Sequence, residues 1–449
     1  WDQLLALAEQ HTAGWSAGEM GRAAEPFTPQ AGAAAQFTLH RLENGLQILA
    51  QRMPDLESVS VCYFVRTGAR DEPDPALYGV SHFLEHMVFK GTARRSTEEI
   101  TLAFNAMGAE FNAFTSTEQT VYYARVLGEY LPQALDLLSD MMRPRLDAHD
   151  FDLERNVILE EIARSEDVPM GQAYRKLLQT YFASHPLGHD VLGTRESIGA
   201  LAVEQMRAYQ QRRYAANNLI LAVAGNFEWD QLLALAEQHT AGWSAGEMGR
   251  AAEPFTPQAG AAVVVKPQLK QQILLLATPS IGIEDPDIYA AELATMVLGD
   301  GGGSRLYWNI YQKGLAETAG ASISAFDHTG MLVTILSTTP DHAPAVLELA
   351  RAELKGLEED GVQADELRRA KDKLISRTVL DGDSAYGRMQ ALAYTWVAEG
   401  RVRSIADEVA AIEAVTLEDV RRVLARFPLT APQVVTAYGP LEAAALGLG

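Results

Sequence analysis

Three side chains on one short segment are of types and at a spacing that could bind and use a metal ion. His82, Glu85 and His86 stand at positions i, i+3 and i+4, so an α-helix places all three on one face. Two neutral imidazoles one turn apart suit a tetrahedral zinc ion, and the glutamate between them could take a proton from a zinc-bound water. The neighbouring side chains are apolar, so without a metal this polar group would be buried and unsatisfied. We therefore predict a hydrolytic zinc site.

A zinc site that hydrolyses a substrate needs a third protein ligand and an open fourth position. Candidates lie in the helical pattern of residues 150–165, where Glu154 and Glu161 are seven residues apart and share a face. Glu160 points about 100° away from that face and is expected to be solvated. The residues alone leave the choice between Glu154 and Glu161 open.

The elements that must position these residues form two related halves. In the first half, residues 37–49 predict a hairpin turning at Asn44-Gly45, residues 58–65 a strand, and residues 79–89 a buried helix. Strand-ending glycines recur at Gly225 and Gly439, an offset of 439 − 225 = 214 residues, and the order of strands and helices recurs with them. We predict an α+β fold of two homologous domains, each a mostly antiparallel sheet with helices packed on one side.

The composition of the chain excludes some classes of binding partner. The chain has 449 residues with 37 basic and 59 acidic side chains, a net charge of 37 − 59 = −22, which argues against nucleic acid and anionic membranes. A single cysteine, Cys62, excludes an intramolecular disulfide framework. No apolar run is long enough to span a bilayer. We expect a cytoplasmic bacterial protein, while a periplasmic or secreted location stays open because the sequence starts at Trp1.

One tract of the sequence is present twice. Residues 1–34 recur without a difference at 229–262, where they continue a strand-to-helix pattern, so we interpret the first copy as an artefact or a swapped helix. The predicted domains are residues 35–243, which carry the zinc site, and residues 263–449, which do not. Residues 244–262, rich in Gly, Ala and Pro, are predicted to link them.

Three motifs make this chain resemble the pitrilysin-like metallopeptidases (family M16, the inverted zincins), including the small bacterial two-domain type and the β subunit of the mitochondrial processing peptidase. The motifs are HFLEH at 82–86, GAEFNAFT at 108–115 and ERNVILEEI at 154–162. The resemblance implies one Zn²⁺ per chain held by His82, His86 and Glu161. It implies that Glu85 is catalytic, that Glu154 supports the ligands from behind, and that the two domains form a clam-like chamber.

The resemblance also implies a substrate-binding strand. Asn112, Ala113 and Phe114 lie on a strand beside the zinc to which a substrate peptide would add its own backbone. An internal hairpin strand without a ligand is the alternative. The implied activity is that of a zinc-dependent endopeptidase acting on unfolded peptides, with a water activated by Glu85 attacking the scissile carbonyl.

The second half departs from the family pattern. Active members carry an Arg and a Tyr seven residues apart that hold the oxyanion, and the matching positions here are Ile310 and Glu317. Neither side chain can donate as required. We therefore expect a homodimer, or a heterodimer with a related subunit that supplies the Arg/Tyr pair. The alternatives are a zinc-bearing subunit that is inactive alone and a non-catalytic subunit of a structural or processing complex.

Overall fold

The computed structural model describes residues 37–246, 248–250 and 253–448. The duplicated tract at 1–34, predicted as an artefact or a swapped helix, lies outside these residues. The first half of the described chain runs to residue 246, and the second half begins at residue 260, within the segment predicted as a linker.

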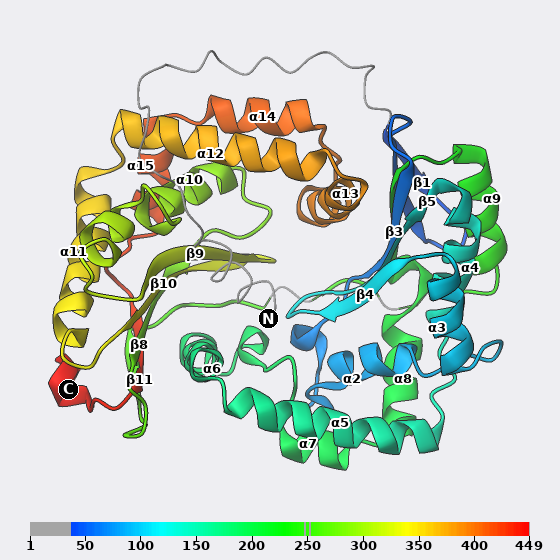
Figure 1. The fold of residues 1–449 in the computed structure, drawn as a ribbon, viewed down its shortest axis with the longest axis horizontal. Coiled ribbons are helices and arrows are strands. Elements are labelled where there is room, and N and C mark those ends of the chain that lie inside the picture. Colours follow the sequence, from blue (N-terminus) through cyan, green and yellow to red (C-terminus); the bar gives the residue numbers. More distant parts are fainter. Residues whose placement is uncertain (1–36, 247, 251–252, 449) are drawn as a thin grey trace. The chain divides into compact units, whose positions relative to one another are not determined.

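The first half is built on a six-stranded sheet (Figure 1) in the order β1-β2-β6-β3-β5-β4. Only β2 and β6 are parallel, and the other neighbouring pairs are antiparallel. The predicted hairpin is confirmed, since Phe37–Arg41 pairs with Gln47–Arg52 and Gly45 takes a φ of 94° in the turn. The strands are β1 (Phe37–Arg41), β2 (Gln47–Arg52), β3 (Ser58–Val65), β4 (Glu110–Thr115), β5 (Thr120–Leu127) and β6 (Leu219–Gly225).

The second half repeats this sheet without its first strand, in the order β7-β11-β8-β10-β9. Here β11 and β7 are the parallel pair. Gly225 and Gly439 end the equivalent strands β6 and β11, and both have positive φ. A Cβ on Gly225 would lie 2.3 Å from the Ser58 carbonyl oxygen, so a glycine is required there. The strands are β7 (Gly260–Val265), β8 (Gln272–Ser280), β9 (Thr318–Phe326), β10 (Thr329–Thr338) and β11 (Val434–Gly439).

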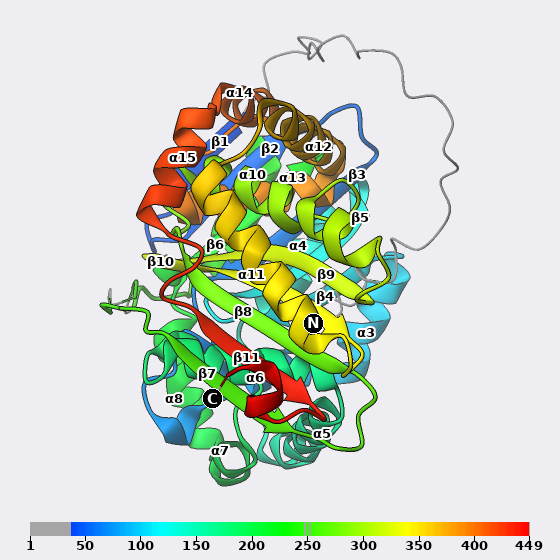
Figure 2. The ribbon, with the colours of Figure 1, turned by 90° about the vertical axis from the view of Figure 1, so that its left-hand side faces the viewer.

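Helices cover both sheets, so the predicted α+β class is confirmed. In the first half they are α2 (Val80–Val88), α3 (Thr97–Ala106), α4 (Leu131–Met141), α5 (Ala148–Glu166), α6 (Pro169–Phe182), α7 (Arg195–Ala200), α8 (Val203–Arg213) and α9 (Trp229–Thr240). In the second half they are α10 (Ile288–Gly299), α11 (Ala343–Asp360), α12 (Ala364–Gly382), α13 (Ala385–Glu399), α14 (Ile405–Ala414) and α15 (Leu417–Arg426). Figure 2 shows α11 crossing the second sheet over β8 and β10.

The prediction that helices pack on one side of each sheet is wrong, because the two halves exchange a helix. Helix α13 of the second half packs on β2, β3 and β6 of the first sheet, with Met389 fully buried in one apolar cluster with Leu49 and Phe64. Helix α6 of the first half packs on β7, β8 and β11 of the second sheet. The two helices stand at equivalent places in the repeat, so each half supplies the cover for the other half's second apolar face.

A buried charge cluster adds to this connection. The guanidinium of Arg250, between the two halves in sequence, binds the carboxylates of Asp71 and Glu118 from the first half and Asp327 from the second. Arg70 also binds Glu118 and donates to the Asp327 carbonyl. Within the described part of the chain, no helix has the length and apolar character needed to cross a membrane.

Candidate metal centre

The helix that carries the H-x-x-E-H motif is anchored by its apolar face. Helix α2 buries Phe83, Leu84, Met87 and Val88 in the core of the first half. The ring of Phe83 stacks on that of Phe151 in α5, with centroids 4.5 Å apart. This contact brings α2 and α5 together, as the sequence requires if a glutamate of α5 is to approach the two histidines.

Helix α5 begins at a side-chain cap and presents its glutamates toward α2. The carboxylate of Asp147 accepts hydrogen bonds from the backbone amides of His149 and Asp150, which have no partner within the helix. From there the spacing of seven residues carries Glu154 and Glu161 along the same face, past the buried Ile158. Glu160 is exposed, as the sequence predicts.

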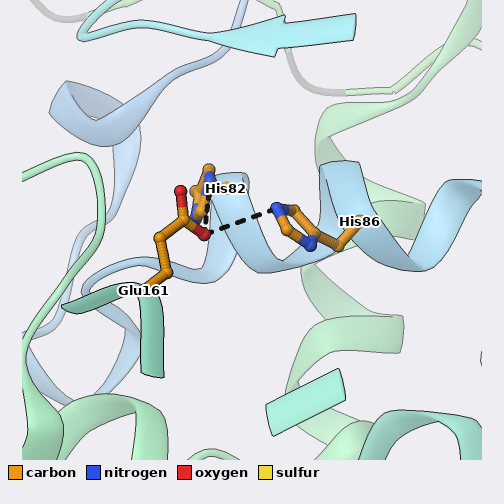
Figure 3. Close-up of side chains that lie close together, drawn as sticks. All are labelled: His82, His86 and Glu161. Carbon is orange, nitrogen blue, oxygen red and sulfur yellow. Dashed lines mark ion pairs between the residues drawn. The ribbon is translucent and has the colours of Figure 1, made fainter. Parts of the chain in front are cut away.

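Three of the predicted residues meet at one point (Figure 3). One ligand atom each from His82, His86 and Glu161 lie within 4.8 Å of one another. The Oε2 atom of Glu161 lies 3.7 Å from Nε2 of His82 and 3.7 Å from Nε2 of His86. Two imidazole nitrogens and one carboxylate oxygen are a donor set that fits a catalytic zinc ion. Among the described residues, this is the one group of three or more His, Cys, Asp or Glu side chains placed to share a metal.

Glu154 occupies a different place from Glu161. Its Oε1 atom lies 2.8 Å from Nδ1 of His86, on the side of the ring away from Glu161, and its Oε2 atom lies 2.6 Å from the Lys90 ammonium. Burial opposes ionisation, but the hydrogen bonds from His86 and Lys90 outweigh it and lower the pKa of Glu154. An ionised Glu154 fixes the His86 tautomer with hydrogen on Nδ1 and leaves the Nε2 lone pair free for a metal.

The two histidines differ in their electrostatics. Burial, helped by the nearby His86, lowers the pKa of His82 to about 3, so its imidazole is neutral at pH 7. Burial also works against a charge on His86, but the hydrogen bond to Glu154 and two further carboxylates outweigh it and raise the pKa of His86. The side chain of His82 is 11% exposed and that of His86 25%, which leaves the site open on the side of His86.

Glu85 is held by a residue of the neighbouring strand. The hydroxyl of Thr115, at the end of β4, donates to Oε2 of Glu85 at 2.6 Å. Burial raises the pKa of Glu85, and the hydrogen bond from Thr115 opposes that rise. A carboxylate whose pKa is raised toward neutrality is suited to proton transfer at pH 7. No sequence periodicity singles out Thr115, because its contact with Glu85 spans 30 residues of chain.

The strand expected to bind substrate is the last strand of the first sheet. Strand β4 pairs with β5 on one side and has no partner strand on its other side within the described residues. Ala113 faces the core at 9% exposure. Asn112 is exposed and Phe114 half-buried. The strand therefore offers an edge without a partner strand that ends at Thr115, beside Glu85, although the amide of Ala113 donates to Oδ1 of Asn112.

At the two positions of the second half where an Arg and a Tyr were expected, the structure has no hydrogen-bond donor side chain. Ile310 is fully buried and Glu317 is exposed. Arg305, the nearest arginine before them, is engaged by Glu366 at 2.7 Å and by the Gly361 carbonyl.

Comparison with known proteins identifies the family. Residues 47–195 match the family model "Insulinase (Peptidase family M16)", and residues 200–374 match "Peptidase M16 inactive domain". An uncharacterized zinc protease of Streptomyces coelicolor is 34% identical over 89% of this chain and 89% of its own length. The chain belongs to peptidase family M16. The uncharacterized zinc protease YmxG of Bacillus subtilis is 30% identical over 84% of this chain and 92% of its own length.

Solved structures agree with this M16 fold. The peptidase M16 inactive domain from Pseudomonas fluorescens superposes with a TM-score of 0.85 at 22% identity, over 91% of this chain and 98% of the other. A protease from Helicobacter pylori gives a TM-score of 0.83 at 21% identity, over 90% and 99% of the two chains. These likenesses establish a common fold.

Proposed function

We propose that this M16 chain is a zinc-dependent endopeptidase that hydrolyses unfolded peptides. The observation that carries the proposal is the meeting of His82, His86 and Glu161 at one point, with Glu85 on the same helix face. These three residues would hold one Zn²⁺, and Glu154 would orient the His86 ring through its hydrogen bond with Nδ1. A bound zinc ion supplies a Lewis acid that polarises the scissile carbonyl and makes a water more acidic.

In this proposal Glu85 is the general base. Its carboxylate accepts a proton from the attacking water and passes it to the leaving amine of the substrate. Thr115 fixes one carboxylate oxygen of Glu85, so the other is left to face the water. The hydrogen bond therefore sets the direction in which the base points.

The substrate would bind along β4. A peptide in extended conformation can pair its backbone with the free edge of Asn112, Ala113 and Phe114, and such pairing reads the backbone more than the side chains. A folded protein has few strands free to pair in this way, which is why we infer that unfolded peptides are the substrates. Because β4 ends at Thr115, pairing there brings the peptide to the side of Glu85.

The presence of Ile310 and Glu317 suggests that this chain needs a partner subunit for activity. Neither can stabilise an oxyanion as an Arg/Tyr pair would, and Arg305 is committed to Glu366. We infer that the active form is a heterodimer in which a related subunit supplies those donors, because a second copy of this chain would carry the same Ile310 and Glu317. In that case the isolated chain binds zinc and has little activity. A non-catalytic role in a larger complex is less well supported, because the residues of the metal motif are all present.

The test uses Glu85→Gln and His82→Ala. Since glutamine cannot accept the proton, Glu85→Gln should lose at least about a thousandfold in turnover of an unfolded peptide library and keep its zinc. His82→Ala should lose zinc on dialysis, as measured by elemental analysis. Full peptidase activity of Glu85→Gln would refute the mechanism. Activity of the wild-type chain only when a related subunit is added would support the partner proposal, and vigorous activity alone would refute it.

A further inference from the structure

A buried carboxylate that the mechanism does not use lies at the start of the metal-binding helix. Glu72, just after the short helix η1 (Ala69–Asp71), is 1% exposed. Its Oε2 atom accepts a hydrogen bond from the amide of Gly79 at 2.8 Å, and its Oε1 atom accepts one from the amide of Ser81 at 2.9 Å. Within the described part of the chain, no lysine or arginine pairs with it. Both of its oxygens are therefore directed at the backbone of α2.

This carboxylate replaces a cap that the helix cannot supply itself. The first amides of a helix have no partner within the helix, and a polar side chain at the N-cap position usually accepts from them. The N-cap of α2 is Gly79, which has a φ of 87°. A Cβ there would lie 2.6 Å from the Leu192 carbonyl oxygen, so Ser, Thr, Asp and Asn are all excluded. Glu72 reaches in from another segment to perform this function.

The capped turn is the one that carries His82, the third residue of the helix. His86 has its ring oriented by Glu154, but Nδ1 of His82 is buried and has no hydrogen-bond partner among the described residues. The position of the His82 ring therefore depends on its backbone. Glu72 holds this turn through the amides of Gly79 and Ser81. Tyr209 holds it through the Ser81 side chain, since the two hydroxyl oxygens lie 2.8 Å apart.

The segment that carries Glu72 also contacts the end of the substrate strand. The amides of Ala69 and Arg70 donate to the carbonyls of Ser116 and Thr117 at 3.2 and 2.8 Å. These residues directly follow Thr115, which binds Glu85. Residues 69–72 thus connect the first turn of α2 to the turn after β4, and hold the metal-binding helix in register with the strand.

We propose that Glu72 is a positioning residue, whose carboxylate holds the first turn of α2 so that His82 can share a metal ion with His86 and Glu161. This inference rests on the proposed zinc function. It goes beyond an ordinary helix cap, because it predicts a loss of metal affinity that capping of other helices does not produce.

The experiment measures zinc affinity by competition with a chromogenic chelator. Glu72→Gln keeps the shape of the side chain but replaces one of its two accepting oxygens with an NH₂ group. That group would face a backbone N–H and could not accept from it. We therefore expect zinc affinity to fall roughly ten- to hundredfold. Tyr209→Phe, which removes only the hydroxyl, is a milder variant and should weaken zinc binding several-fold. Ser404→Ala is the matched control, because it removes the N-cap of α14 in the second half.

Ser404→Ala should lower folding stability and leave zinc affinity at the wild-type value. Wild-type affinity in Glu72→Gln would overturn the inference, and so would the same loss in Ser404→Ala, because it would show general destabilisation. If Glu72→Gln does not fold, wild-type affinity in Tyr209→Phe overturns the inference, because Tyr209 and Glu72 hold the same turn through Ser81. A wild-type chain that binds no zinc would instead refute the proposed function itself.

Discussion

The hydrogen bond behind His86 offers a sharp test of how the metal centre is built. In the structure Glu154 accepts from Nδ1 of His86 at 2.8 Å, and its side chain is 7% exposed. Glu154→Gln keeps the length and shape of the side chain and a carbonyl oxygen that can still accept. It removes the negative charge that makes the opposite ring nitrogen of His86 a better ligand.

The size of the effect follows from the change in the hydrogen bond. A hydrogen bond to a charged group contributes about 1.5–3 kcal/mol and a neutral one about 0.5–1.5 kcal/mol. The difference, about 1–2 kcal/mol, corresponds to roughly a tenfold change in an equilibrium constant. Solvent screens this interaction little, because Glu154 is buried. We therefore expect Glu154→Gln to bind zinc about ten times more weakly than the wild-type chain.

The assay is a zinc titration against a chelator of known affinity at pH 7 and low salt. Glu160→Gln is the matched control, since it removes the same charge from the same helix at an exposed position that points away from the site. We expect its zinc affinity to equal that of the wild type. Equal affinities of Glu154→Gln and the wild type would refute the assignment of Glu154 as the residue that orients His86.

Three further predictions concern other parts of the chain. Thr115→Val removes the hydrogen bond to Glu85 and should lower kcat about tenfold with unchanged zinc content, while Thr115→Ser restores kcat. Burial raises the pKa of Glu292 to about 7, so the folded state loses stability as pH rises from about 4.5 through 7 and this carboxyl ionises. The difference in unfolding free energy between Glu292→Gln and the wild type should therefore shift in favour of the variant between pH 5 and pH 8. We expect a shift on the order of 2 kcal/mol, measured by urea unfolding. Met389→Ala should cost about 2–4 kcal/mol in the same assay and destabilise the first half, although Met389 belongs to the second, because α13 covers the first sheet. Separate unfolding of the two halves in that variant, with the first half unchanged, would contradict the exchange of helices.

The side chains on α2 could be predicted because the geometry of a helix is local. Positions i, i+3 and i+4 of any α-helix share a face, so His82, Glu85 and His86 come together wherever the helix lies. The strands were predictable for a similar reason, since alternation and an Asn-Gly turn specify hairpins within a few residues. The repeat of 214 residues, visible in the sequence, predicted that strands and helices follow in the same order along the chain in both halves.

The choice between Glu154 and Glu161 was not local. Both lie on one face of α5, and periodicity treats them alike. The packing of α5 on α2, including the stacking of Phe83 on Phe151, sets the height at which the two helices pass. That height places Glu161 at the Nε2 atoms of both histidines and Glu154 at the Nδ1 atom of one.

The contacts that support the site were decided by the tertiary structure alone. Glu72 lies seven residues before Gly79, the N-cap of the helix it caps, in a loop without periodicity, and Thr115 reaches Glu85 across 30 residues of chain. Helices α6 and α13 carry ordinary amphipathic patterns, which predict that an apolar face is buried but not against which sheet. Local spacing therefore determined which residues can do chemistry in this protein, and long-range packing decided which of them meet and what holds them in place.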